Sequence, residues 1–272
     1  MAVGTEPGEP DRENEDFAAV LPGAVVVIDG ASAPAGWESG CSHSVAWYAR
    51  TLGGLLAGAV TDRSSTLAEA LESAIERVVL AHGDTCDVGS PHSPSATVAV
   101  ARATGDRLEY LVLADAMVLL GRASGEPLAV IDDRLEVLRR RIDTGEEIAP
   151  IGSDVRSFAS LSRVEKFAAY RNRTEGFWVA STQPAAAREA VTGALPLADV
   201  VSVSAMTDGA TRLVDLFGLC TWAGALDVLT REGPAGLIRR TREAEATDPD
   251  GKRWPRPKRR DDATAVHWTL QD

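Results

Sequence analysis

Four aspartates stand where a predicted β-strand meets a turn. They are Asp29, Asp115, Asp208 and Asp261. Burying a carboxylate inside a strand is unfavourable, whereas carboxylates at several strand ends can meet at one edge of a sheet sandwich. Carboxylates that meet repel one another, and a divalent cation neutralises them. The pattern predicts a centre in which two ions share a water, lower its pKa and direct it at a phosphorus atom.

The nature of the ligands narrows the choice of metal. Ligation by oxygen atoms alone suits Mg²⁺ or Mn²⁺ better than Zn²⁺. Asp-Gly and Asp-Asp are also ordinary turn sequences, so any one of these aspartates taken alone could have a purely structural role. The ordered set favours the metal centre.

The cysteines and histidines offer softer ligands. The cysteines are Cys41, Cys86 and Cys220, and the histidines are His43, His82, His92 and His267. The cysteines are far apart and odd in number, which disfavours a disulfide framework. The spacing of the histidines relative to Cys41 or Cys86 matches no standard zinc site. The sequence therefore predicts neither a disulfide nor zinc.

The composition excludes some classes of protein. The 272 residues include 28 Lys and Arg and 40 Asp and Glu, which gives a formal charge of −12 and disfavours a general nucleic-acid binder. No apolar stretch is long enough to span a bilayer, and the acidic residues 1–16 lack the pattern of a secretory signal. We expect a cytoplasmic monomer with neither a nucleic-acid nor a membrane partner.

The elements that position the first aspartate are well marked. The run Ala24–Ile28 is rich in β-branched residues, as in a strand buried on both faces, and it ends at Asp29-Gly30. Helical periodicity begins near Val45. Thr66 and Glu69 form a capping box for a second helix that ends near His82.

Further strands position the other aspartates. They are predicted at Ser95–Ala103, Leu108–Leu113, Met117–Arg122, Leu128–Ile131, Phe177–Ser181, Val200–Met206 and Ala263–Leu270. The first four read as an antiparallel meander with Asp115 in a tight link. A helix is expected between the fifth and sixth, and more helices after Asp208. Residues 132–174 are charged and partly helical, and form a candidate flap. No internal repeat or linker divides the chain, so we expect one domain over residues 1–272.

In their order, these motifs resemble the metal-dependent serine/threonine phosphatases, the PPM or type 2C family, in its bacterial form. The similar segments are Asn14-Glu15-Asp16, Val27-Ile28-Asp29-Gly30, Pro94-Ser95-Ala96-Thr97, Leu113-Ala114-Asp115-Ala116, Met206-Thr207-Asp208-Gly209 and Asp261-Asp262-Ala263-Thr264. They extend over nearly the whole chain. The resemblance implies an α+β fold, a four-layer α/β/β/α sandwich in which helices flank a central antiparallel β-sandwich with the metal site at one edge.

The resemblance also implies a role for each site residue. The direct ligands of two Mn²⁺ or Mg²⁺ ions would be Asp29, the Gly30 carbonyl, Asp208 and Asp261. Asp115 would hold a third, weaker ion together with Asp208, and Glu15 and Asp16 would hold metal-bound waters. Asp262 is the alternative to Asp261. Arg12 is the candidate phosphate clamp, and Arg12, Asp29 and Asp208 are the candidate catalytic residues.

Some positions depart from the family pattern. Ala31 follows Asp29-Gly30, where some members have a histidine that could act as a general acid. Asp115 lies between Ala114 and Ala116, where glycine and serine are expected. The resemblance implies hydrolysis of phosphoserine or phosphothreonine in proteins by a metal-bridged hydroxide. The departures leave open a pseudophosphatase that binds and regulates a partner, and a phosphatase of a small metabolite remains a third hypothesis.

Basic residues are concentrated in the run Lys252–Arg260, just before Asp261. One interpretation is electrostatic attraction of a phosphorylated or acidic partner. The other is an ordinary solvated loop.

Overall fold

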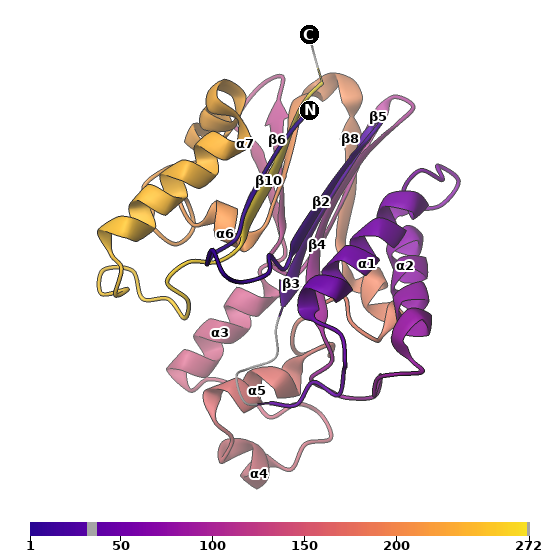
Figure 1. The fold of residues 1–272 in the computed structure, drawn as a ribbon, viewed down its shortest axis with the longest axis vertical. Helices are drawn as coiled ribbons and strands as arrows, with labels where there is room; N and C mark the ends of the chain where they lie inside the picture. The colour runs from indigo at the N-terminus through magenta and orange to yellow at the C-terminus, as the bar shows by residue number, and fades with distance from the viewer. Residues whose placement is uncertain (32–36, 271–272) are drawn as a thin grey trace.

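Two antiparallel β-sheets face each other in the computed structural model, which describes residues 1–31 and 37–270 (Figure 1). In these residues the first sheet has the order β2 (Asp16–Leu21), β3 (Ala24–Ala31), β4 (Ser95–Thr104), β5 (Arg107–Leu113), β8 (Val191–Pro196). The second has the order β1 (Ala2–Glu6), β10 (Ala263–Thr269), β9 (Val200–Met206), β6 (Met117–Arg122), β7 (Leu128–Ile131).

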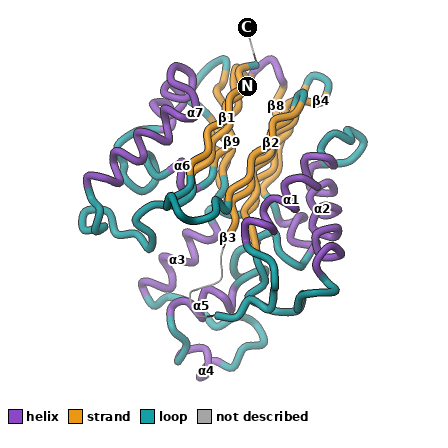
Figure 2. The backbone as a smooth tube through the Cα atoms, viewed as in Figure 1, coloured by secondary structure: helices purple, strands orange, loops and turns teal. Residues whose placement is uncertain are grey.

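Helices cover the outer face of each sheet, so the chain has the predicted four-layer α/β/β/α architecture (Figure 2). Helices α1 (Val45–Ala59) and α2 (Leu67–His82) pack on the first sheet. Helices α6 (Asp208–Thr211) and α7 (Trp222–Thr247) pack on the second. No helix in the described residues is long and apolar enough to cross a membrane.

Strand β3 shows why the core forms. Its alternate residues Val25 and Val27 are buried between the two sheets, while Val26 and Ile28 are buried against α1 and α2. Burial of each such side chain contributes about 1.5–3 kcal/mol. The prediction that this run is buried on both faces is confirmed.

The capping box of α2 is also confirmed. Thr66 Oγ1 accepts a hydrogen bond from the Glu69 N–H at 3.2 Å, and Glu69 Oε2 accepts one from the Thr66 N–H at 2.8 Å. The helix ends at His82, as predicted.

The predicted meander is wrong at one link. Strands β4 and β5 form a hairpin in the first sheet, whereas β6 and β7 form a hairpin in the second. The link Ala114-Asp115-Ala116 therefore crosses from one sheet to the other instead of turning within a sheet. Ala114 makes this crossing with a φ of 61°, in the left-handed region that disfavours residues with a side chain.

The strand predicted at Phe177–Ser181 is wrong as well. Only isolated bridges occur there, and Phe177 and Val179 instead fill a small apolar cluster. The helix expected next is a short 3₁₀ turn, Pro184–Glu189, followed by β8. Strand β8 has a weak apolar pattern and forms because β5 offers it a free edge.

The segment between β7 and β8 contains α3 (Arg134–Thr144), α4 (Val155–Ala159) and α5 (Arg163–Tyr170). It lies beyond the end of the sandwich at which β3 ends (Figure 1). Its apolar cluster consists of Ala114, Leu138, Ile142, Phe158, Tyr170, Phe177 and Val179. The segment is partly helical, as predicted, and its action as a flap stays a prediction.

The strain at Ala114 leads to a prediction about stability. Ala114→Gly should leave the free energy of unfolding within about 0.5 kcal/mol of the wild type. Glycine removes the strain of the left-handed φ, which stabilises the native state by about 1–2 kcal/mol. Two losses offset this gain. The buried methyl group contributed about 0.8 kcal/mol, and the greater freedom of the unfolded chain costs about 0.4–1 kcal/mol.

Ala116→Gly is the matched control. Ala116 is equally buried and is not among the described residues with positive φ. The Ala116→Gly variant should lose about 1–2 kcal/mol of unfolding free energy, because it loses a buried methyl group and gains unfolded-chain freedom without any release of backbone strain. Urea unfolding measures both variants, and equal destabilisation would contradict the account.

Candidate metal centre

The strand register brings the predicted aspartates to one end of the sandwich. Asp16 on β2 is the direct cross-strand partner of Asp29 on β3. In the second sheet, Met206 on β9 pairs with Met117 on β6 and with Ala265 on β10. The chain positions just beyond these pairs are the neighbourhoods of Asp115, Asp208 and Asp261, so both sheets contribute carboxylates at this end.

The electrostatics of Asp29 indicate that other carboxylates lie near it. Burial raises the pKa of Asp29 well above its ordinary value, and the charges of four other carboxylates raise it further. Those carboxylates are Asp16, Asp208, Asp115 and Asp261. Asp29, Asp115, Asp208 and Asp261 each keep part of their residue surface exposed.

Asp208 begins α6 and is the second strongly perturbed group. Burial, followed by the charges of Asp115 and Asp261, raises its pKa from 3.8 to about 8, although Arg212 opposes the shift. Such clusters of shifted carboxyls are typical of functional sites.

Asp16 is a buried carboxyl with one oxygen available to a cation or to a water. Burial is the largest cause that raises its pKa to about 7, against hydrogen bonds from Thr264 and Thr207 that lower it. Thr207 Oγ1 donates to Asp16 Oδ2 at 3.0 Å, but Oδ1 is buried with no partner in the described part of the chain. A cation or its bound water would satisfy that oxygen. The donor set here is oxygen alone, which fits Mn²⁺ or Mg²⁺.

Asp261 and Asp262 have different surroundings. Asp262 accepts two backbone hydrogen bonds, from the N–H of Gly8 at 2.7 Å and from the N–H of Glu15 at 2.6 Å. Through these two hydrogen bonds, the Asp262 carboxylate holds the loop between β1 and β2 in position. Asp261 instead contributes charge to the cluster around Asp29 and Asp208. These contacts favour Asp261 as the ligand and give Asp262 a positioning role.

Two cationic side chains that the sequence analysis did not single out contact Asp261. Arg212 Nη2 donates to Asp261 Oδ2 at 2.9 Å, and Lys258 Nζ donates to Oδ1 at 2.7 Å. Arg212 is itself buried and pairs with Glu245 at 2.9 Å. Lys258 belongs to the basic run just before Asp261. The position of this run beside a predicted metal ligand is the sequence feature that could have identified Lys258 as a contact of Asp261.

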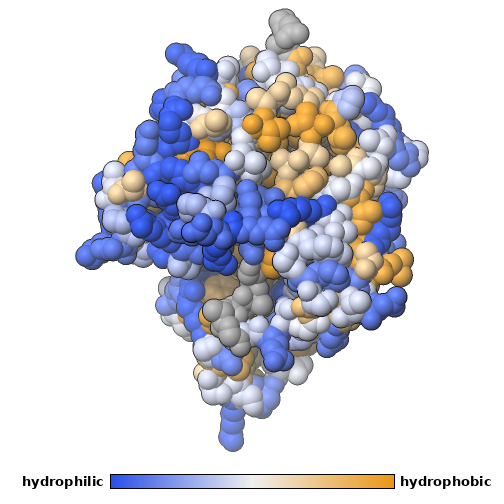
Figure 3. Space-filling model, viewed as in Figure 1, coloured by the Kyte–Doolittle hydropathy of each residue, from blue (hydrophilic) through white to orange (hydrophobic). Residues whose placement is uncertain are grey.

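The basic run divides into structural and exposed residues. Arg256 is almost fully buried and pairs with Asp248 at 3.1 Å. Lys252, Arg253, Lys258 and Arg259 are exposed. Figure 3 shows a hydrophilic surface over the loop that follows α7. The loop is therefore partly structural, and its exposed cations remain available to attract an anionic group.

Gly30 lies where a side chain would not fit. A Cβ atom there would be 2.6 Å from Val45 Cγ1 and 2.7 Å from the Glu15 carbonyl oxygen. The Gly30 N–H donates to that same oxygen at 3.1 Å. Ligation of a metal by the Gly30 carbonyl stays a prediction.

Asp115 and Arg12 complete the predicted set. Burial raises the pKa of Asp115, while its own backbone N–H and Arg139 on α3 lower it. Arg12 is exposed in the loop between β1 and β2, where its N–H donates to the Glu9 carbonyl at 3.1 Å. None of the ion pairs among the described residues includes Arg12, so its role as a phosphate clamp stays a prediction.

Because α1 packs against α2, cysteines and histidines whose sequence spacing matches no standard zinc site lie together. The structure brings Cys41, His43, His82 and Cys86 together, with their ligand atoms within 4.8 Å of one another. Cys41 Sγ and Cys86 Sγ, which are 45 positions apart in the sequence, are separated by 3.1 Å. His267, by contrast, is a buried strand residue whose Nδ1 is 2.9 Å from Ser204 Oγ.

Comparison with known proteins supports the same architecture. The family model described as Protein phosphatase 2C matches residues 12–141. Among curated proteins, none matches the sequence significantly.

Solved structures match over the whole chain. The catalytic domain of the serine/threonine phosphatase PstP, in complex with two manganese ions, is 16% identical with a TM-score of 0.59, and the match covers 100% of this chain and 97% of PstP. MsPP from Mycobacterium smegmatis is 18% identical with a TM-score of 0.57, covering 99% and 97%. Stp1 from Staphylococcus aureus is 11% identical with a TM-score of 0.60, covering 100% and 94%. At these identities the matches show the fold.

The raised carboxyl pKa values predict how the metal-free protein responds to pH. Asp208 keeps its proton up to about pH 8 in the native state, whereas an ordinary carboxyl loses it near 3.8. Since the unfolded chain has already released that proton, the free energy of unfolding falls as pH rises between these values. In chelator, the melting temperature should therefore decrease from pH 5 to about pH 8.

Asp208→Asn tests this dependence. The variant should melt higher than the wild type in chelator at about pH 8 and should show a shallower dependence on pH. Thermal scans across pH measure both effects. A wild-type melting temperature that rises over this range in chelator would contradict the assignment.

Proposed function

We propose that this chain is a metal-dependent phosphatase of phosphoserine and phosphothreonine in proteins, and the match of residues 12–141 to the protein phosphatase 2C family model supports this proposal. The observation that carries the proposal is the convergence of carboxylates on Asp29. Burial and the charges of four acidic neighbours raise the pKa of Asp29 well above its ordinary value. A group of carboxylates of this kind suits divalent cations, which take oxygen ligands.

The residues would divide the work as follows. Asp29, Asp208 and Asp261 would bind two divalent cations, with Asp115 available to a third beside Asp208. Bound cations would supply the charge that neutralises the phosphoryl oxygens and would acidify the attacking water. Asp16, with its unpartnered Oδ1, would orient water at the centre. Asp262 would keep the loop of Glu15 against the site through its two backbone hydrogen bonds.

Lys258 is a second candidate for binding the substrate phosphate. Its side chain is half exposed, donates to Asp261, and lies near enough to Asp29 and Asp208 for their charges to raise its pKa, against burial, which lowers it. An ammonium group at the rim of the centre can bind a phosphate oxygen as a point charge.

A specific observation favours the second function, a pseudophosphatase that binds and regulates a partner. Both carboxylate oxygens of Asp261 are paired with cationic side chains, Arg212 and Lys258. These cations compete with metal ions for the same oxygens. If the ion pairs persist in the presence of metal, the centre recognises a partner without hydrolysing a phosphate ester.

Hydrolysis of p-nitrophenyl phosphate separates the two functions. The phosphatase proposal expects turnover that needs Mn²⁺ or Mg²⁺ and that a chelator abolishes. Asp29→Asn should lower kcat/KM by about 1,000-fold or more, since metal ions provide several kcal/mol of charge stabilisation in the transition state.

Asp106→Asn is the control, because Asp106 is an exposed turn residue at the opposite end of β4. It should retain wild-type activity. Turnover that is absent in the wild type at every Mn²⁺ concentration would reject the phosphatase and leave the pseudophosphatase. Phosphopeptides compared with small phosphorylated metabolites then test the substrate class.

Paired variants identify the group that binds phosphate. Lys258→Ala should lower kcat/KM by about 10- to 100-fold if its ammonium contacts phosphate, as expected for a hydrogen bond to a charged group worth about 1.5–3 kcal/mol. Arg12→Ala, measured under the same Mn²⁺ saturation, gives the competing assignment. A loss confined to Arg12→Ala would return the role to Arg12.

A further inference from the structure

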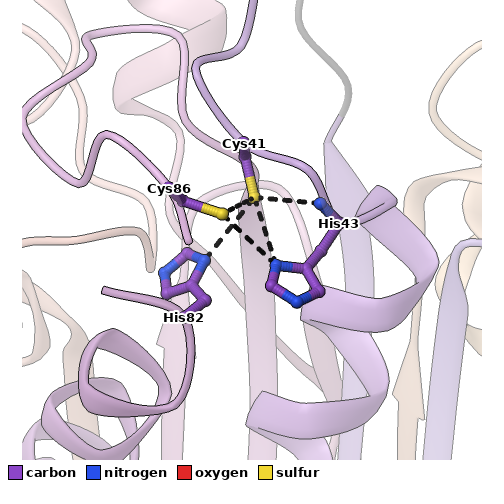
Figure 4. Close-up of side chains that lie close together, drawn as sticks. All are labelled: Cys41, His43, His82 and Cys86. Atoms are coloured by element: carbon purple, nitrogen blue, oxygen red, sulfur yellow. Dashed lines mark hydrogen bonds between the residues drawn. The ribbon is translucent and has the colours of Figure 1, made fainter. Parts of the chain in front are cut away.

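A group of soft metal ligands lies apart from the carboxylate centre. Cys41 and His43 come just before α1, His82 is the last residue of α2, and Cys86 lies in the loop that follows (Figure 4). Helices α1 and α2 pack side by side, so the start of one meets the end of the other. In Figure 4 the two sulfurs and the two imidazole rings point toward one common space.

Two distances between the ligand atoms match tetrahedral zinc coordination, and two are shorter. With a Zn–S bond of about 2.3 Å and a Zn–N bond of about 2.0–2.1 Å, tetrahedral geometry separates two sulfurs by about 3.8 Å and a sulfur from a nitrogen by about 3.6 Å. Cys41 Sγ lies 3.7 Å from His43 Nδ1 and 3.6 Å from His82 Nδ1. Cys86 Sγ lies 3.3 Å from His43 Nδ1 and 3.1 Å from Cys41 Sγ.

We propose that Cys41, His43, His82 and Cys86 bind one structural zinc ion. Two thiolates with two imidazoles are a common ligand set for zinc, and a hard cation such as Mn²⁺ prefers oxygen. Four protein ligands fill the tetrahedron and leave no open position for a substrate, so the ion is structural.

Neighbouring groups orient these ligands. The Trp47 ring stacks on the His43 ring with a centroid distance of 3.9 Å and an angle of 20°, which fixes the plane of that imidazole. The backbone N–H of His43 donates to Cys41 Sγ at 3.4 Å, and the backbone N–H of Ser42 donates to Cys86 Sγ at 3.3 Å. Such bonds stabilise the negative charge of thiolate ligands and hold them in position.

The site would have a mechanical consequence for the carboxylate centre. An ion held by these residues joins the start of α1 to the end of α2 and to the loop that leads into β4. Val45, two residues after His43, is the side chain packed most closely on Gly30. The zinc would therefore fix α1 at the position where it supports the end of β3.

Zinc content of the full chain tests the proposal. Protein purified without chelator should contain one zinc per chain that remains bound through gel filtration, measured by mass spectrometry of the metal. Cys41→Ser and Cys86→Ser should lose it, with affinity weakened by more than about 100-fold. Cys220→Ser is the matched control, because Cys220 lies outside the cluster, and it should retain the full content.

Cobalt substitution separates this site from the carboxylate centre. Co²⁺ bound by the wild type should give the thiolate-to-cobalt charge-transfer absorption that oxygen ligands cannot produce. Asp208→Asn should keep that absorption, and Cys41→Ser should lose it. This outcome does not depend on whether the protein is a phosphatase.

The proposal is overturned by either of two results. One is a wild type that contains no more zinc than Cys41→Ser and shows no thiolate absorption with Co²⁺. The other is a Cys41–Cys86 disulfide in protein kept under reducing conditions, seen after unfolding in chelator as one free thiol per chain in place of three. Because thiol counting and metal analysis use the wild type, the test holds even if a cysteine variant fails to fold.

Discussion

Mutual repulsion among the carboxylates around Asp29 is the constraint on which the rest of the site depends. Burial and four acidic neighbours together raise the pKa of Asp29. Like charges brought together in the low dielectric of a protein repel one another more strongly than they do in water. Because a whole domain is stable by only about 5–15 kcal/mol, several such pairs require neutralisation by protons, cationic side chains or metal ions.

Cationic side chains hold Asp261 and the start of β10 in place. Arg212 bridges Asp261 and Glu245, and Arg242 donates to Glu245 at 2.9 Å and to the Asp261 carbonyl at 2.7 Å. Breaking a buried pair of this kind typically costs about 3–5 kcal/mol, so this network fixes the start of β10. Lys258 is the exposed member of the group.

The features that the sequence predicts are those encoded locally. The run Ala24–Ile28 and the Thr66 cap carry their own patterns, and the ordered motifs locate the aspartates. Long-range pairings carry no such pattern: Asp262 is held by Gly8 and Glu15, 254 and 247 positions away. Likewise Cys41 meets Cys86 across 45 positions only because α1 packs on α2. Strand β8 and the crossing at Ala114 depend on which edges the other strands leave free, so pattern alone misassigned them.

Calorimetric titration of the metal-free protein with Mn²⁺, in two buffers of different ionisation enthalpy, tests the central claim most directly. If metal ions neutralise the carboxylates, more than one ion should bind to the aspartates, and protons should be released near pH 7, where Asp16 and Asp208 still hold them with pKa values of about 7 and about 8. The apparent enthalpy would then differ between the buffers. Absence of Mn²⁺ binding, or binding with no proton release, would contradict the account.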